Sequence, residues 1–281
     1  MPFPRRLGEP YVSRTMQEVA MTEAWEVLSA GPPDAARSVL LLPGGAMAAR
    51  SFNLVMAEPA LAGVRLVATT LPGMAGAPLA EDESIPAIAR QAGELAKEHG
   101  CDVVVGFSYG ATVALEMALS GDFHGPVVLL GISLTPAVEN RMFRGVIRVS
   151  EKVGSWPMAL MIRLMPMMAK SAKTTDEHKQ ELIEDIKRND AGDSVRTSIE
   201  YLRYTSAGAD AATRLAALSN PVWVVHAEEK GDGGLTDAER ATLEAAPNVS
   251  VVTIPGAVFL LPDEEPRQVA EVIAAAVAEA T

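Results

Sequence analysis

The 281-residue sequence holds a single cysteine, Cys101, so no disulfide can form within the chain. A chain of this kind fits a reducing compartment. No apolar run approaches the roughly 20 residues that a membrane-spanning helix needs. The first 24 residues carry three arginines but no continuous apolar stretch, which argues against a secretory signal. These absences predict a cytoplasmic protein with no membrane span.

Basic residues are scarce compared with acidic ones. The sequence has 24 Lys and Arg against 36 Asp and Glu, a formal net charge of −12 at pH 7. Nucleic acids and anionic membrane surfaces select for basic patches, so we expect neither as a partner. Phosphate-binding and dinucleotide-binding glycine motifs are also missing from the strand-to-helix turns. We therefore expect no cofactor and no metal.

Residues 106–110 read Gly-Phe-Ser-Tyr-Gly, a G-x-S-x-G motif. An apolar β-branched run, residues 103–105, precedes the motif, and an apolar-periodic segment typical of a helix follows it. This setting predicts a strand that ends on one strained residue, Ser108, before a helix begins. Gly106 and Gly110 lack the Cβ atoms that would collide where the strand and helix pass. Ser108 should therefore lie exposed at the carboxyl edge of a sheet.

Short apolar strands alternate with helices along most of the chain. Strands this apolar on both faces belong in a parallel sheet covered by helices, an α/β fold. Ser84 is predicted to cap a helix that runs to about His99, and Thr236 and Glu239 form a capping box. The last helix is expected at about residues 266–280. The expected strands are residues 39–42, 64–70, 103–105, 127–130, 222–225 and 251–254.

Residues 136–219 interrupt this alternation with helical patterns and no convincing strand. We therefore divide the chain into a first core segment (1–135), a helical insertion (136–219) and a second core segment (220–281). The insertion is rich in methionine, an adaptable apolar residue. Its helices either pack a core of their own or form a lid whose apolar face lines a pocket, and both can hold together. Six of the 13 methionines lie here: Met142, Met158, Met161, Met165, Met167 and Met168.

The glycine loop at residues 43–45, the serine motif and the helical insertion together resemble the α/β-hydrolase family. The resemblance spans the chain from about Val39 and implies a mostly parallel, doubly wound sheet with an inserted helical lid. It also implies that Ser108 is the nucleophile and that two backbone amides form an oxyanion hole. These amides would belong to Tyr109 and to Ala46 or Gly45.

Three positions or segments depart from the family pattern: a loop, the catalytic acid and the catalytic histidine. In the loop at residues 70–75, Thr70 and Ala75 stand where an aspartate and a glycine are frequent. The usual position of the catalytic acid holds Lys230, and a small shift of the loop would let Asp232 serve instead. Asp232 could equally be a solvated turn residue.

The expected position of the catalytic histidine holds Phe259. The stretch from Pro255 and Gly256 to Pro262 and Pro266 aligns without a gap, so misalignment does not rescue a histidine. Phenylalanine cannot accept the serine proton, and a serine hydroxyl without a base is a poor nucleophile.

None of the four histidines is required by the sequence to replace that base. His99 and His124 are expected at the surface, His226 packs inward at the end of a strand, and His178 lies on the polar face of a lid helix. A lid histidine could still swing over the serine.

Three functions remain open. The first is a serine hydrolase of a small apolar ester or thioester. The second is a non-hydrolytic enzyme, such as a lyase, isomerase or cyclase, that uses the oxyanion amides alone. The third is a pseudoenzyme that binds a small apolar ligand, because Phe259 would make the pocket more apolar. The oligomeric state stays open.

Overall fold

The computed structural model describes residues 17–21, 25–135, 141–208, 210–228, 234–256 and 260–280. Its described strands form one eight-stranded sheet in the order β1-β2-β4-β3-β5-β6-β7-β8. Pairing is parallel from β4 to β8, and antiparallel between β1 and β2 and between β2 and β4. The predicted α/β fold with a mostly parallel sheet is confirmed. The strands are β1 Gln17–Met21, β2 Glu26–Ala30, β3 Ser38–Leu42, β4 Arg65–Thr69, β5 Val103–Phe107, β6 Val127–Leu130, β7 Val222–Ala227 and β8 Val249–Ile254.

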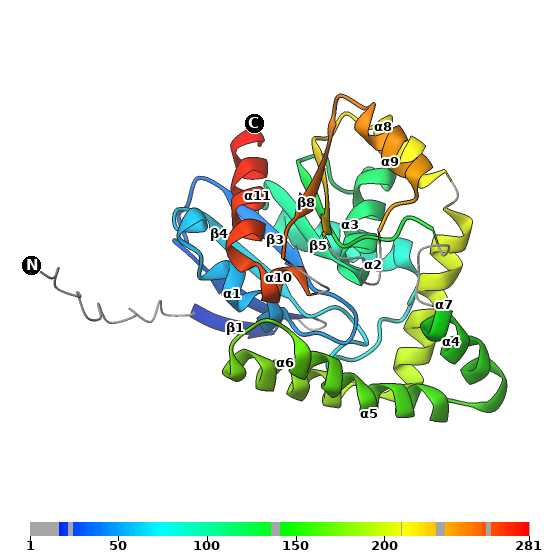
Figure 1. Ribbon diagram of the computed structural model, residues 1–281. Helices are drawn as coiled ribbons and strands as arrows, with labels where there is room; N and C mark the ends of the chain where they lie inside the picture. The colour runs from blue at the N-terminus through cyan, green and yellow to red at the C-terminus, as the bar shows by residue number, and fades with distance from the viewer. Residues whose placement is uncertain are drawn as a thin grey trace, which may run out of the picture.

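Alternate residues of the central strands pack on opposite faces of the sheet, as the two-residue period of a strand requires. In β3, Val39 and Leu41 join one buried cluster, whereas Leu40 and Leu42 join the other. Helix α11 covers the first face, and α2 and α3 cover the second (Figure 1). The helices of these layers are α1 Asn53–Met56, α2 Ile85–Glu98, α3 Tyr109–Ser120, α9 Asp237–Glu244, α10 Leu261–Glu264 and α11 Pro266–Glu279, with short 3-10 turns at Ala49–Phe52 and Pro59–Leu61.

The two predicted helix starts, at Ser84 and Thr236, are confirmed, but Ser84 does not cap its helix as predicted. α2 begins directly after Ser84, but the Ser84 side chain makes no capping hydrogen bond, and its backbone N–H donates to Asp82 instead. The capping box of Thr236 and Glu239 is present at the start of α9.

Five helices lie between β6 and β7: α4 Arg141–Val153, α5 Trp156–Ser171, α6 Asp176–Arg188, α7 Ala191–Ala207 and α8 Ala211–Ala216. α8 packs with α9 beside the sheet, whereas α4 to α7 form a separate layer beyond the carboxyl ends of the strands (Figure 1). We call α4 to α7 the inserted helices. Their methionines are found both inside and at the surface: Met158 is buried, whereas Met142 and Met167 are exposed. No helix in the described ranges is both long enough and apolar enough to cross a bilayer.

Candidate active site

Ser108 occupies a strained turn between the end of β5 and the start of α3. Its φ of 49° and ψ of −111° lie outside the regions that a residue with a side chain prefers. The backbone around it is held on both sides. The Ser108 N–H donates to Leu130 O on β6 at 2.9 Å, and Ser108 O accepts from the Thr112 N–H at 3.1 Å. The half-buried serine is therefore presented at the carboxyl edge of the sheet by hydrogen bonds from two elements.

The two glycines of the motif are required by close backbone contacts. A Cβ added at Gly106 would lie 2.2 Å from Gly110 O, and one added at Gly110 would lie 2.2 Å from Leu42 O. Both contacts are with backbone atoms, which cannot move aside as a flexible side chain can. The start of α3 is thus packed directly against the ends of β3 and β5.

The loop after β3 lies beside this turn. A Cβ added at Gly45 would be 3.8 Å from Tyr109 Cβ, so Gly45 and Tyr109 are neighbours. Ala46 has a φ of 64°, and its N–H donates to Met74 Sδ at 3.2 Å. A thioether is a weak acceptor that a stronger one can replace. Tyr109 is the first residue of α3, where a backbone N–H has no acceptor within the helix.

Asn189, at the end of α6, joins two loops at this edge. Its side-chain nitrogen donates to Ala46 O at 3.0 Å, and its side-chain oxygen accepts from the Ala75 N–H at 2.9 Å. Ala46 and Ala75 both have positive φ, 64° and 47°. One buried amide therefore holds two strained loops in position, and nothing in the local sequence pattern identified it.

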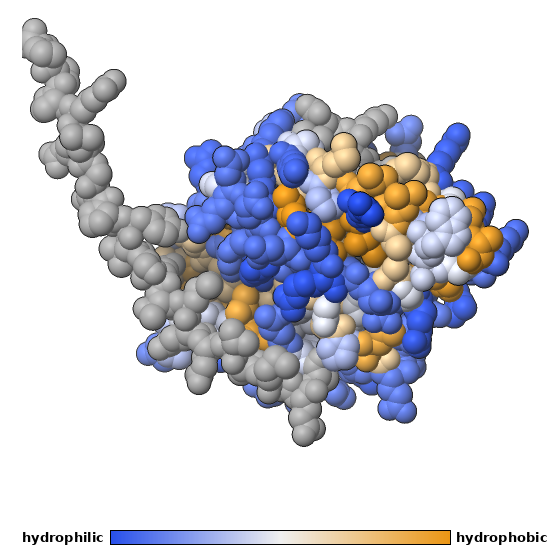
Figure 2. Space-filling view, turned by 90° about the horizontal axis from the view of Figure 1, so that it is seen from below, coloured by the Kyte–Doolittle hydropathy of each residue, from blue (hydrophilic) through white to orange (hydrophobic). Residues whose placement is uncertain are grey.

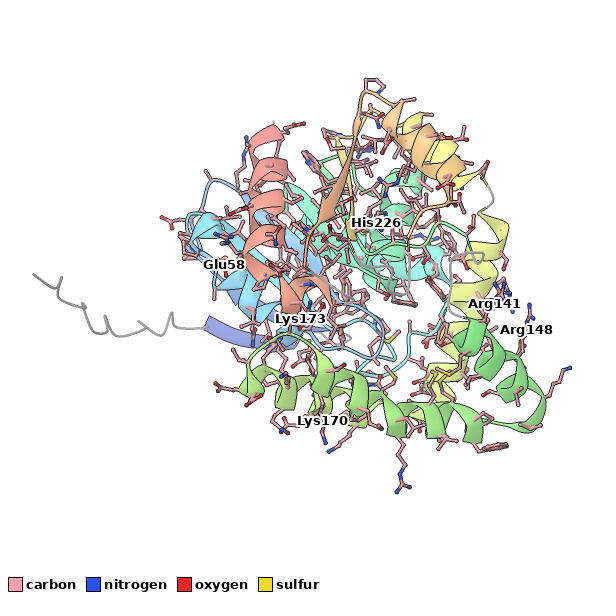
Figure 3. All side chains as sticks on the ribbon, viewed as in Figure 1. Glu58, Arg141, Arg148, Lys170, Lys173 and His226 are labelled. Carbon is pink, nitrogen blue, oxygen red and sulfur yellow. The ribbon has the colours of Figure 1, made fainter. Side chains whose placement is uncertain are left out.

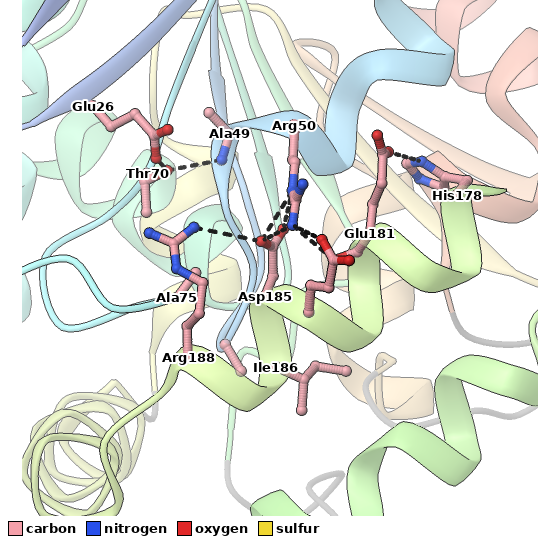
Figure 4. A network of polar contacts seen from close by, with 12 residues as sticks. Glu26, Ala49, Arg50, Thr70, Ala75, His178, Glu181, Asp185, Ile186 and Arg188 are labelled. Carbon is pink, nitrogen blue, oxygen red and sulfur yellow. Dashed lines mark hydrogen bonds and ion pairs between the residues drawn. The ribbon is translucent and has the colours of Figure 1, made fainter. Parts of the chain in front are cut away.

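Thr70 stands where the family frequently has an aspartate, and its hydroxyl makes two hydrogen bonds there. Its hydroxyl donates to Glu26 Oε2 at 2.7 Å and accepts from the Ala49 N–H at 2.9 Å (Figure 4). Glu26 comes from β2, which the sequence did not predict. A carboxylate from β2, the strand between β1 and β4, thus takes part in organising the loop after β3.

An ion pair with a buried carboxylate joins α6 to the 3-10 turn at Ala49–Phe52. Arg50 Nε lies 3.0 Å from both carboxylate oxygens of Asp185, and Arg50 Nη2 lies 2.6 Å from one of them (Figure 4). The Asp185 side chain is completely buried. Hydrogen bonding to Asp185 outweighs burial and raises the pKa of Arg50 further above its ordinary value.

His178 is placed differently from the prediction. Instead of facing solvent on α6 it is 3% exposed, with Nε2 2.7 Å from Asp263 Oδ1 and Nδ1 3.1 Å from Glu181 Oε2. Burial lowers the pKa of His178, but the hydrogen bonds and charges of Asp263 and Glu181 prevail and raise it. The side chain is already engaged by two carboxylates, so the prediction that it lies on the polar face of the helix is wrong.

The other histidines offer no evident base in the described part of the chain. His124 is exposed and His99 is half-buried, whereas His226 is 6% exposed at the end of β7. Burial, together with the charge of Arg240, lowers the pKa of His226 to about 4. Val224, two residues earlier, belongs to the face covered by α2 and α3, so the strand period directs His226 to that face as well.

Asp232, Lys230 and Phe259 lie outside the described residues, so their predicted roles stay predictions. The chain resumes after Phe259 close to the serine turn, because a Cβ added at Gly131 would lie 3.4 Å from the Phe107 ring and 3.9 Å from Leu261 Cδ1. Next to Ser108, Tyr109 is 6% exposed, and its ring centroid lies 6.0 Å from that of Tyr201. Among the described residues its hydroxyl has no hydrogen-bond partner.

The sequence profile described as "Alpha/beta hydrolase family" matches residues 39–272. No curated protein sequence matches this chain. Among solved structures, an esterase from Thermogutta terrifontis is 20% identical with a TM-score of 0.68, covering 89% of this chain and 91% of that one. A thioesterase domain from the curacin biosynthetic pathway is 17% identical with a TM-score of 0.65, covering 89% and 94%. The epoxide hydrolase CorEH is 20% identical with a TM-score of 0.65, covering 90% and 94%.

At these identities the structural matches show the fold alone. The profile match covers most of the chain and includes the glycine loop, the serine turn and both core segments. The chain therefore belongs to the alpha/beta hydrolase family.

Proposed function

We propose that the protein is a serine hydrolase of a small apolar ester or thioester, with Ser108 as the nucleophile. The observation that carries this proposal is the strained φ of 49° at Ser108, directly before a helix start and beside the Gly45–Ala46 loop. Strain of this kind concentrates at functional sites, because the surrounding structure must hold it in place. The similarity to an esterase and to a thioesterase domain supports acyl chemistry on this fold.

In the proposed reaction Ser108 Oγ attacks the acyl carbon, and the carbonyl oxygen becomes an oxyanion. The Tyr109 N–H, and the Ala46 or Gly45 N–H, would donate to it. Ala46 would exchange the Met74 sulfur, a weak acceptor, for a charged oxygen, so this hydrogen bond would strengthen as the charge develops. Collapse of the oxyanion would break the C–O or C–S bond of the substrate, and the alcohol or thiol would leave with the proton lost by Ser108. Water would then attack the acyl-enzyme, release the acid and return a proton to Ser108 Oγ.

The proposed mechanism needs a base for the Ser108 proton, and none is identified among the described residues. Phe259 stands in the usual histidine position, Asp232 would be the acid, and His178 is held by Asp263 and Glu181. Without a base the expected rate falls by several orders of magnitude. We therefore expect slow acyl transfer. The alternative is a non-hydrolytic enzyme or a ligand-binding pseudoenzyme that uses the same pocket.

The inserted helices are proposed to cover the Ser108 edge of the sheet as a cap. Three connections favour a fixed wall over a freely swinging lid: Arg50 with Asp185, Asn189 with two loops, and Lys173 with Gly256 O at 2.9 Å. Substrate would then enter beside α6 without displacing it.

A fluorophosphonate probe followed by intact-mass spectrometry tests the proposal. We expect one adduct on the wild type at neutral pH and none on Ser108→Ala, with Ser120→Ala as the matched serine control on the exposed end of α3. Absence of an adduct on the wild type would overturn an activated nucleophile.

A second experiment introduces a histidine as the base. If only the histidine is missing, Phe259→His should accelerate both labelling and the hydrolysis of short p-nitrophenyl esters. A labelled wild type with no gain from Phe259→His would place the defect in the acid or the pocket. Ligand binding that survives Ser108→Ala, without any labelling, would favour the pseudoenzyme.

A further inference from the structure

α5 carries apolar side chains on two opposite faces. Met158 and Ile162 point into the core, where they are 1% and 9% exposed. Trp156, Leu160 and Leu164 lie on the other side of the helix and are 62%, 51% and 51% exposed. A helix that is apolar all round is normally buried on every side. The outer face of α5 has no such cover.

This outer face is part of a larger apolar surface. Every large hydrophobic side chain that is exposed in the described part of the chain belongs to α4 or α5, two helices in contact with each other. Figure 2 shows this surface as an orange patch on the lower side of the molecule, broken by a strongly hydrophilic side chain. Contiguous exposed patches of this kind mark interaction sites on monomeric proteins. The seven residues are Met142, Val149, Val153, Trp156, Leu160, Leu164 and Met167.

The charge of these two helices is opposite to that of the chain. Residues 141–171 contain six basic residues and one acidic residue, Glu151, in a protein with a net charge of −12. Arg141 and Arg148 project into solvent from α4, and Lys170 projects from α5 (Figure 3). Within the described ranges, none of Arg141, Arg148, Lys152, Arg163 and Lys170 forms a salt bridge.

Basic and apolar residues are also interleaved along one helix. On α5, Arg163 and Lys170 fall within about 40° of Trp156 around the helix axis, at 100° per residue, along one margin of the apolar stripe. An exposed Trp and Leu stripe bordered by Arg and Lys is the pattern of helices that lie in a membrane interface. Tryptophan favours the headgroup level, where its ring is both apolar and polar.

We propose that α4 and α5 dock on an anionic phospholipid surface, with the Trp156–Leu160–Leu164 stripe in the headgroup layer. Two copies meeting through the same patch would bring the basic residues of both face to face, which disfavours a symmetric dimer. An anionic surface instead satisfies both the charge and the apolar stripe. The expectation against an anionic membrane rested on the net charge of the whole chain, but most of the acidic residues lie outside α4 and α5. The inference does not depend on the chemistry at Ser108.

Vesicle co-sedimentation of the full chain tests the proposal. We expect binding to vesicles of phosphatidylcholine mixed with phosphatidylserine, little binding to phosphatidylcholine alone, and weakening by salt. Arg163→Glu with Lys170→Glu should reduce affinity by more than about tenfold. The matched control, Arg90→Glu with Lys97→Glu on exposed positions of α2, reverses the same number of charges and should leave binding nearly unchanged.

Tryptophan fluorescence supplies an independent readout. Trp156 is the exposed member of the three tryptophans, since Trp25 and Trp223 are 5% and 6% exposed. Its emission should shift to the blue when anionic vesicles are added, and the shift should be lost in Trp156→Phe. Leu160→Ser with Leu164→Ser should weaken binding with only a small loss of folded-state stability, since both side chains are 51% exposed.

Three results would overturn the proposal. The first is no binding to anionic vesicles. The second is binding that the α2 control reduces as much as the α5 variant does. The third is a Trp156 shift that depends on protein concentration alone and accompanies dimer formation in analytical ultracentrifugation, which would make the patch a contact between copies. Binding to an acidic protein without binding to vesicles would likewise assign the surface to a protein partner.

Discussion

The Asn189 side-chain nitrogen donates to the carbonyl oxygen of Ala46 at 3.0 Å, across 143 residues of sequence. The same side chain accepts from the Ala75 N–H at 2.9 Å. Because Ala46 is a candidate oxyanion residue, the end of α6 directly supports the backbone on which the proposed chemistry depends. The inserted helices are thus joined to the site by a hydrogen bond as well as by apolar packing.

Asn189→Ala should lower the free energy of unfolding by about 2–3 kcal/mol, because it leaves the buried Ala75 N–H and Ala46 O without their partner. Urea denaturation measures this loss. Asp190→Asn is the matched control, since asparagine caps α7 about as well as aspartate does, and it should change stability little. Equal effects of the two variants would contradict the role assigned to Asn189.

Gly110→Ala should prevent folding or cost more than about 3 kcal/mol, because the new Cβ would lie 2.2 Å from Leu42 O. Gly145→Ala is the control on α4, where nothing lies within 4 Å of the added Cβ. That change should stabilise the protein by about 0.5–1 kcal/mol through helix propensity. Thermal unfolding of both variants separates a packing requirement from a general effect of removing glycine.

The sequence predicted those parts of the fold that depend on local patterns. The apolar runs at β3 to β8 and the glycines at positions 106 and 110 carry their own physical signal, since strand period and backbone collision are properties of neighbouring residues. The strand β2, which lies between β1 and β4, carries no such signal. Its residues, Glu26–Ala30, are mostly half-buried and lack an apolar run.

The parts of the site that were missed depend on packing between distant segments. Asn189 and Asp185 meet their partners across 143 and 135 residues. His178 was predicted to be solvated because its neighbours on α6 are polar, but it is buried and meets Asp263 across 85 residues. On α5, periodicity cannot tell which of two apolar faces is covered. The outward position of Trp156 and Leu160 therefore required the structure.

Arg50→Ala should cost about 3 kcal/mol, because it leaves the completely buried Asp185 carboxylate with only the longer contact to Arg188 Nη1 at 3.8 Å. Arg240→Ala removes an exposed arginine from a pair with Glu244 and should cost less than about 1 kcal/mol. Arg50→Met combined with Asp185→Leu should recover much of the loss, since an apolar pair of similar size needs no charge compensation. A double variant as unstable as the single one would show that geometry, not charge, sets the requirement.

His178 and His226 should affect the pH dependence of stability with opposite signs. The pKa of His178 is raised above its value in the unfolded chain, so its contribution is present below about pH 6.5 and is lost as the pH rises through the folded pKa. The pKa of His226 is lowered to about 4, so the protein loses up to about 3 kcal/mol as the pH falls from about 6.5 to 4.

Urea denaturation across this range, with one variant for each histidine, measures the two contributions separately. His178→Asn should lose more stability, relative to the wild type, at about pH 5.5 than at about pH 8.5. His226→Asn should reduce the fall in the free energy of unfolding between about pH 6.5 and 4. The change in packing should add a loss of stability that is the same at every pH. Each variant is the control for the other, because both remove one buried imidazole. Parallel shifts of equal slope would show that neither ring changes its proton affinity on folding.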